Sequence, residues 1–101
     1  FDEIDTGISG ITAGKVGDRL RLIGKSRQVI CITHLPQIAA TADHHFLIRK
    51  KAEGTSVRTD VEMLDEAASV EELARLLGGA NVTERVMESA KELKELAKCE
   101  R

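Results

Sequence analysis

Aromatic side chains are almost missing from this 101-residue sequence, which has two phenylalanines and neither tyrosine nor tryptophan. Surfaces that bind single-stranded nucleic acid by base stacking need aromatic platforms, so this class of surface is disfavoured. The formal charge of −2 provides no general electrostatic attraction toward DNA or a membrane. The short basic run Arg49-Lys50-Lys51 is better interpreted as the solvated end of a strand. The core must therefore consist of leucine, isoleucine, valine and alanine.

Cysteine is also scarce, and Cys31 and Cys99 form no paired motif. Two isolated thiols, one of them in an apolar run, favour a reduced intracellular compartment. Zinc-type spacing is missing, and neighbouring residues of a strand point to opposite sides, so a metal shared by His44 and His45 is disfavoured. The sequence has no signal peptide and no membrane-length apolar run, which predicts a cytoplasmic protein without a membrane partner.

The apolar spacing in the first third of the sequence predicts a parallel α/β unit. Residues 1–4 are expected to end a strand, and a loop at 5–10 leads into a helix over 11–23 that Gly24 terminates. Residues 28–33 form a continuous apolar run, which is typical of a strand covered on both faces. Strand, helix and strand at this spacing predict a right-handed parallel crossover.

A short helix and a hairpin are predicted next. Pro36 suits the first turn of the helix. Strands at 46–49 and 57–64, joined by a turn at Gly54, predict an antiparallel hairpin. Apolar and charged residues alternate along 57–64, so one face of this strand is expected to be wet.

Two helices are predicted at the C-terminal end. Ser69-Val70-Glu71-Glu72 resembles a capping box for a helix that stops at Gly78-Gly79, and residues 81–84 resemble a second box. The last helix has one apolar face, which favours packing against the chain, with a coiled coil as the alternative. That face consists of Val82, Val86, Ala90, Leu93 and Ala97.

Two carboxylates, Asp2 and Glu3, follow the first predicted strand. Ligands of open α/β sheets bind outside the carboxyl ends of the strands. A carboxylate at this edge can hold Mg²⁺ through water, and its neighbour can polarise the water that attacks a phosphate. A solvated turn is the alternative for such a pair taken alone.

His34 follows the apolar run, so we expect it at the same sheet edge as the carboxylate pair. A histidine at this position can donate a hydrogen bond to a γ-phosphate oxygen, and Thr33 is able to assist it. The alternative is that His34 caps the helix that begins at Pro36.

Three strings occur in order over nearly the whole chain: FDEIDTGISG, RQVICITHLPQIAATADHHFLI and ELARLLGG. Together they resemble the C-terminal part of the head domain in the RecN family of bacterial DNA repair proteins, within the SMC-like branch of the ABC ATPases. The resemblance implies that residues 1–101 form a partial P-loop, ABC-type nucleotide-binding fold that begins at the end of the Walker B strand. This fold would have parallel core strands, an added hairpin and two C-terminal helices.

The resemblance also implies roles for single residues. Asp2 matches the Mg²⁺ side of Walker B, Glu3 matches the catalytic carboxylate, and His34 matches the switch histidine that senses the γ-phosphate of ATP. In the complete protein, a homodimer of ATP-sandwiched heads would act on DNA in double-strand break repair and recombination, at the bacterial nucleoid. The D-loop, which reaches across that dimer, matches Thr6, Gly7, Ile8, Ser9 and Gly10.

The sequence departs from the family pattern because Walker A, the Q-loop and the signature motif are missing. We therefore expect the N-terminal half of the head to be a partner, the chain alone to be inactive as an ATPase, and sheet edges and apolar surface to be uncovered. One alternative is a non-catalytic interaction domain that uses the hairpin and the terminal helix. Another is a stand-alone metal-dependent hydrolase that uses Asp2, Glu3, Asp5 and His34.

Overall fold

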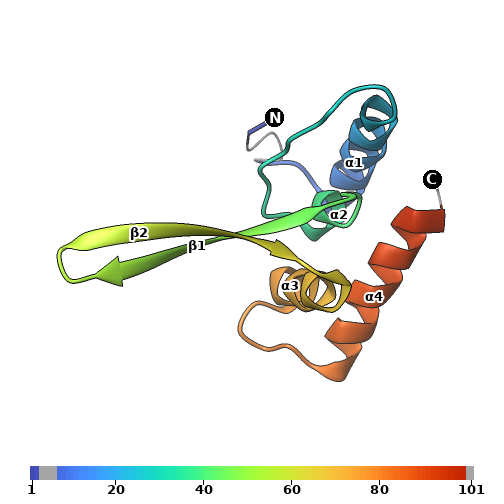
Figure 1. The fold of residues 1–101 in the computed structure, drawn as a ribbon. Helices are drawn as coiled ribbons and strands as arrows, with labels where there is room; N and C mark the ends of the chain where they lie inside the picture. The colour runs from blue at the N-terminus through green and yellow to red at the C-terminus, as the bar shows by residue number, and fades with distance from the viewer. Residues whose placement is uncertain (3–6, 100–101) are drawn as a thin grey trace.

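Four helices and one two-stranded sheet make up the fold in a computed structural model, which describes residues 1–2 and 7–99. The hairpin projects away from the helices, with α1 and α2 on one side of its base and α3 and α4 on the other (Figure 1). The mixed α/β class, the hairpin and the two C-terminal helices are confirmed. The elements are α1 (Gly10–Gly24), α2 (Pro36–Ala39), β1 (His45–Glu53), β2 (Ser56–Leu64), α3 (Glu66–Gly78) and α4 (Glu84–Cys99).

Helix α1 forms where the apolar spacing predicts it. Ala13, Gly17 and Leu20 are buried, and their spacing of four and three residues places them on one face. The helix ends at Gly24, as predicted, and Lys25 follows in a right-handed helical conformation. This glycine is therefore not needed for a left-handed turn.

The predicted parallel core strands are not seen in the part of the chain that the structure describes. Residues 28–33 make one parallel bridge, between Asp2 and Ile32. Ile30 is 71% exposed and Ile32 is 46% exposed, so this run is not covered on both faces as predicted. A strand needs backbone partners along its length, and the pairing described between this run and residues 1–2 is a single bridge.

The hairpin is confirmed, and its strands are longer than predicted. β1 and β2 pair antiparallel along their whole length, and Gly54 supplies the left-handed conformation of the turn with a φ of 61°. The alternating pattern predicts one wet face, but both faces of β2 are largely exposed. On the apolar face, Val57, Val61 and Met63 are 68%, 65% and 59% exposed.

Helix α3 begins earlier than predicted. Asp65 is its N-cap, and the carboxylate accepts a hydrogen bond of 2.8 Å from the backbone N–H of Ala68. The prediction that Ser69 opens the helix is wrong, because Ser69 lies inside it and is buried. Aspartate caps as well as serine does, so burial of Ser69 decides between the two possible starts. The predicted end is confirmed: α3 stops at Gly78, and Gly79 has a φ of 61°.

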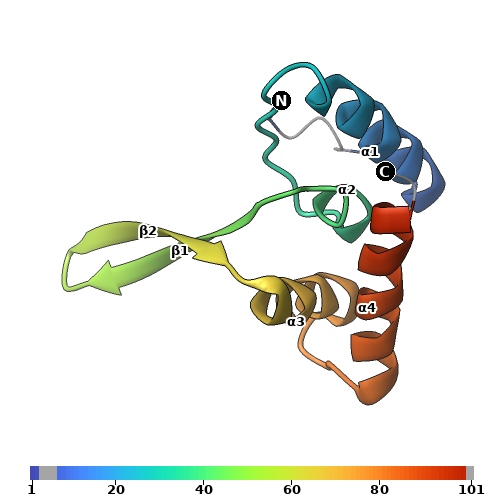
Figure 2. The same cartoon turned by 45° about the vertical axis from the view of Figure 1, so that its right-hand side comes forward.

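Helix α4 packs against α3 as one amphipathic helix (Figure 2). Thr83 caps its start, since its Oγ1 accepts a hydrogen bond of 3.3 Å from the N–H of Val86. Ala90 and Ala97 of the predicted apolar face are buried. Val82 precedes the helix and is 44% exposed, so it is not part of that face.

Two clusters of buried apolar residues hold the helices together. Leu73 lies at the centre of the larger cluster, which joins α2, α3 and α4, and Ile38 belongs to a smaller one that joins α1 and α2. The short helix α2 therefore contacts both groups of helices. Within the described ranges, no helix has the length and apolar character needed to cross a membrane. The clusters consist of Ala40, Val70, Leu73, Ala74 and Ala90, and of Ala13, Leu20 and Ile38.

Candidate functional site

The two chain segments that carry the predicted chemistry lie side by side. The N-terminal amino group of Phe1 donates a hydrogen bond of 2.8 Å to the carbonyl of Ile30, and the N–H of Ile32 donates one of 2.8 Å to the carbonyl of Phe1. Asp2 thereby pairs with Ile32 in a parallel bridge. The two segments run in the same direction, as the predicted crossover requires.

His34 lies two residues beyond this bridge and is exposed, as is Asp2. Thr33 orients the turn that follows, because its hydroxyl accepts a hydrogen bond of 3.1 Å from the N–H of Leu35. Leu35 is the N-cap of α2, and α2 has no side-chain cap hydrogen bond. The alternative in which His34 caps this helix is therefore not what the structure shows.

The predicted D-loop leads directly into α1. Gly7 has a φ of 79°, a left-handed conformation that glycine adopts without strain. Ile8 is half-buried against the smaller core cluster, which anchors the loop. Ser9 is the N-cap of α1, and Gly10 is its first residue. Two other predicted site residues, Glu3 and Thr6, fall outside the residues that the structure describes, as does Asp5.

Two hydrogen bonds join Ser9 to Thr12 at the start of α1. The hydroxyl of Ser9 accepts a hydrogen bond of 3.3 Å from the N–H of Thr12 and donates one of 3.1 Å to the Thr12 hydroxyl. Across from it, the amide nitrogen of Gln37 lies 3.2 Å from the position that a Cβ on Gly10 would occupy. A larger residue at position 10 would only shift the flexible end of the Gln37 side chain, so this contact does not require glycine as strictly as a backbone contact would.

The described residues contain no group of three or more histidine, cysteine or acidic side chains able to hold a metal ion. His44 is exposed, while its neighbour His45 is half-buried and faces α3. The stand-alone metal hydrolase hypothesis combines Asp2 and His34 with two undescribed residues, so the structure provides only half of that set.

His45 takes part in a polar contact that the sequence patterns do not predict. Its Nδ1 lies 2.8 Å from the hydroxyl of Ser69, and this hydrogen bond ties β1 to α3. Burial lowers the pKa of His45, and the nearby charge of Lys94 lowers it further, while Glu72 acts in the opposite direction. Lys94 is itself largely buried and forms a 3.1 Å ion pair with Glu66. The sequence does not reveal this contact because Ser69 and the residues after it match a capping box, which predicts Ser69 at the exposed start of a helix.

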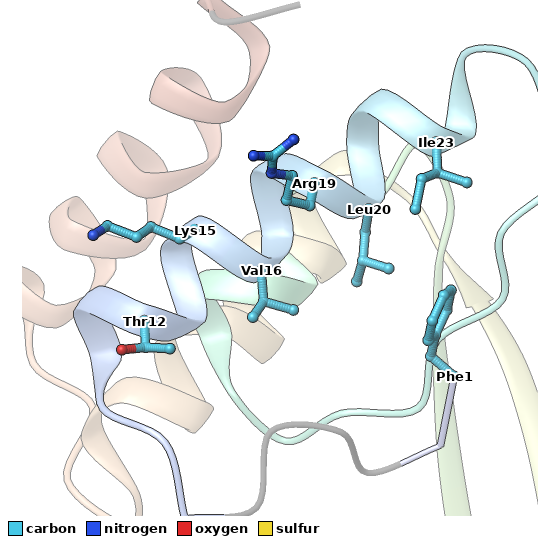
Figure 3. A pocket seen from close by; sticks show the side chains of 7 residues that line it. All are labelled: Phe1, Thr12, Lys15, Val16, Arg19, Leu20 and Ile23. Atoms are coloured by element: carbon cyan, nitrogen blue, oxygen red, sulfur yellow. The ribbon is translucent and has the colours of Figure 1, made fainter.

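An open apolar groove of about 310 Å³ runs between α1 and the N-terminal residue (Figure 3). Val16, Leu20 and Ile23 point toward the side on which Phe1 lies, whereas Lys15 and Arg19 point away from it. Phe1 is 58% exposed and Ile23 is 40% exposed. Among residues 1–2 and 7–99, this groove is lined mainly by apolar side chains of α1 and by Phe1.

A carboxylate and an exposed histidine thus flank one parallel bridge, and the proteins to which the chain is similar are bacterial DNA repair proteins. No protein-family model matches the sequence. These relatives all carry the name RecN. The chain is 48% identical to "DNA repair protein RecN" of Halalkalibacterium halodurans over 97 residues, which cover 96% of the chain and 17% of that protein.

Other RecN proteins match to a similar extent. The protein of Vibrio cholerae is 47% identical over 93 residues, which cover 92% of the chain and 17% of the relative. The protein of Streptomyces coelicolor is 41% identical over 101 residues, which cover the whole chain and 18% of the relative. The chain is therefore homologous to RecN along nearly its whole length, and it spans less than a fifth of the length of these relatives.

Proposed function

We propose that this chain supplies the hydrolytic residues of an ATPase head in a RecN-type DNA repair protein. The observation that carries the proposal is the parallel bridge between Asp2 and Ile32, two residues before His34. The bridge supports the proposal because it pairs Asp2 with Ile32, and the chain is homologous to DNA repair proteins. In the complete protein, ATP hydrolysis would serve DNA double-strand break repair and recombination.

Asp2 is the proposed Mg²⁺ residue. Magnesium keeps much of its water shell and is held by one or two carboxylates together with the phosphates of the nucleotide. A single exposed carboxylate fits this demand, although it would not fit a metal enclosed by protein ligands alone. When bound, Mg²⁺ would neutralise the phosphate charge that develops during the reaction.

Glu3 and His34 are the proposed catalytic pair. As a neighbour of Asp2, Glu3 would accept a proton from the attacking water. His34 is exposed and has no role in capping α2, so its ring is available to donate a hydrogen bond to a γ-phosphate oxygen.

Thr6 through Gly10 are proposed as a D-loop that meets a second head across the ATP. The packing of Ile8 against the smaller cluster and the Ser9–Thr12 hydrogen bond would fix the end of this loop at the start of α1. The chain alone has no phosphate-binding loop in its sequence, so we propose that the other half of the head provides it. We expect the isolated chain to show neither micromolar ATP binding nor ATP hydrolysis.

The test uses a RecN-length protein that contains this segment. We expect Glu3→Gln to lower ATP turnover by at least about 100-fold while ATP binding and head dimerisation persist. His34→Gln should lower turnover as well, whereas the exposed His44→Gln serves as a matched control without effect. Full turnover in Glu3→Gln would remove this residue from the role of base. Tight ATP binding by the isolated chain, measured by calorimetry, would contradict the need for a second half.

A further inference from the structure

The hairpin exposes four large apolar side chains on one face at its base. They form two cross-strand pairs, Phe46 with Met63 and Ile48 with Val61. Their exposed fractions are 54% and 59% in the first pair and 51% and 65% in the second. Because residues two apart on a strand point the same way, these four side chains form one continuous surface, which we call the hairpin patch. Its exposed area is on the order of 400 Å², comparable to the largest apolar patch of a typical monomer.

At the base of the hairpin, the opposite face is partly covered, whereas toward the tip it is exposed. On this face Leu64 is buried and Leu47 is half-buried. Leu47 lines a cavity of about 250 Å³ together with Ala68 of α3. The base of β1 is therefore apolar on both faces, in the run Phe46-Leu47-Ile48. Such a run is typical of a strand that is buried on both sides. Only one of these two sides has its cover within the described residues.

The charges of the hairpin restrict what can cover the patch. All of its carboxylates lie on the face opposite the patch, because Glu53, Asp60 and Glu62 alternate with the patch residues. Lys50 is the charged residue on the patch side, and no ion pair within residues 1–2 and 7–99 involves it. A second copy that used the same face would bring a second lysine and no carboxylate.

We propose that the hairpin patch is the docking surface for the remaining part of the RecN-length polypeptide, through an apolar element that carries a carboxylate near Lys50. The length outside the chain supports this occupant, because the chain accounts for only 17% of the relatives in Halalkalibacterium and Vibrio. The inference rests on the proposed function only in taking the chain as part of such a protein. It does not depend on Asp2, Glu3 or His34.

Hydrogen exchange measured by mass spectrometry tests the proposal, with the RecN-length protein and the 101-residue chain compared under the same conditions. We expect the amides of 45–49 and 60–64 to exchange at least about tenfold more slowly in the longer protein, whereas the tip at 51–58 exchanges alike in both. Equal exchange at the base of the hairpin in both proteins would overturn the proposal. Protection in the short chain that grows with its concentration would also overturn it, in favour of a second copy.

A pair of variants makes the test specific to the patch. In the longer protein, Phe46→Ser should remove most of the protection at the base of the hairpin. Val57→Ser, on the same face but near the tip and 68% exposed, should leave it unchanged. An equal effect of both variants would contradict a contact confined to the base. ATP turnover of Glu3→Gln in the same preparation reports on the proposed function separately, because that substitution is not expected to alter hairpin exchange.

Discussion

Replacement of Gly17 by alanine is expected to destabilise the chain, whereas the same change at Gly14, one turn earlier in α1, is expected to stabilise it. A Cβ on Gly17 would lie 2.9 Å from the methyl carbon of Thr41 and 3.1 Å from the backbone oxygen of Gln37. A Cβ on Gly14 would meet nothing within 4 Å. The two glycines share a helix and differ mainly in what they face.

The magnitudes follow from two opposing effects. Alanine is favoured over glycine in a helix interior by about 0.5–1 kcal/mol, and Gly14→Ala should gain this amount in full. At Gly17 the added methyl group overpacks the contact with α2, which costs about 1–3 kcal/mol. The oxygen of Gln37 belongs to the backbone of α2, so it cannot rotate away as a flexible side chain would. We expect a net loss of about 1 kcal/mol for Gly17→Ala.

Urea denaturation followed by circular dichroism measures both variants against the parent chain. Opposite signs of the change in the free energy of unfolding are expected. If both alanines stabilise the chain equally, α1 and α2 do not approach as closely as the structure shows. The contact matters for the site, because α1 begins at the predicted D-loop and α2 begins two residues after His34.

Two further predictions concern the α3–α4 side of the molecule. Burial, and to a lesser extent the charge of Lys94, lowers the pKa of His45 below its ordinary 6.5. At pH values between the folded-state pKa and 6.5, the folded chain therefore binds fewer protons than the unfolded chain. The free energy of unfolding should therefore fall as the pH decreases from 6.5 through the folded-state pKa, and His45→Gln should flatten this dependence in denaturation curves while His44→Gln retains it. Leu73→Ala should lower the free energy of unfolding by about 2–5 kcal/mol in the same assay, since Leu73 is fully buried. Leu96→Ala, on the exposed side of α4, should change it by less than about 0.5 kcal/mol, and equal losses would contradict the observed core.

Local sequence signals predict the elements that depend on a few neighbouring residues. Gly54 and Gly79 each adopt a left-handed conformation where a turn and a helix end are expected. The apolar spacing of α1 gives its bounds to within a residue at each end. These features need little information from the rest of the molecule, because backbone conformation and helical periodicity are decided locally.

The errors arise where a pattern fits more than one tertiary arrangement. Asp65 and Ser69 both offer a side-chain acceptor ahead of acidic and apolar residues, and only the burial of Ser69 against His45 selects the earlier helix start. Local pattern rules cannot foresee that contact, which joins residues 24 apart. For the site, the sequence pattern predicts that Asp2 and His34 lie at the same edge of a sheet. The structure supports this prediction only through the parallel bridge between Asp2 and Ile32, two residues before His34.

The overturned parallel sheet and the hairpin patch have the same physical explanation. An apolar run predicts that a segment is covered, but it does not say which residues cover it. Residues 28–33 and 46–48 have the composition of buried strands, yet Ile30, Ile32 and Ile48 are 71%, 46% and 51% exposed. If the longer polypeptide provided cover for the hairpin alone, the exposure of Ile30 and Ile32 would need a separate cause. A single added layer that contacts both segments would explain all three exposures, and Ile32 would then connect this layer to the bridge with Asp2.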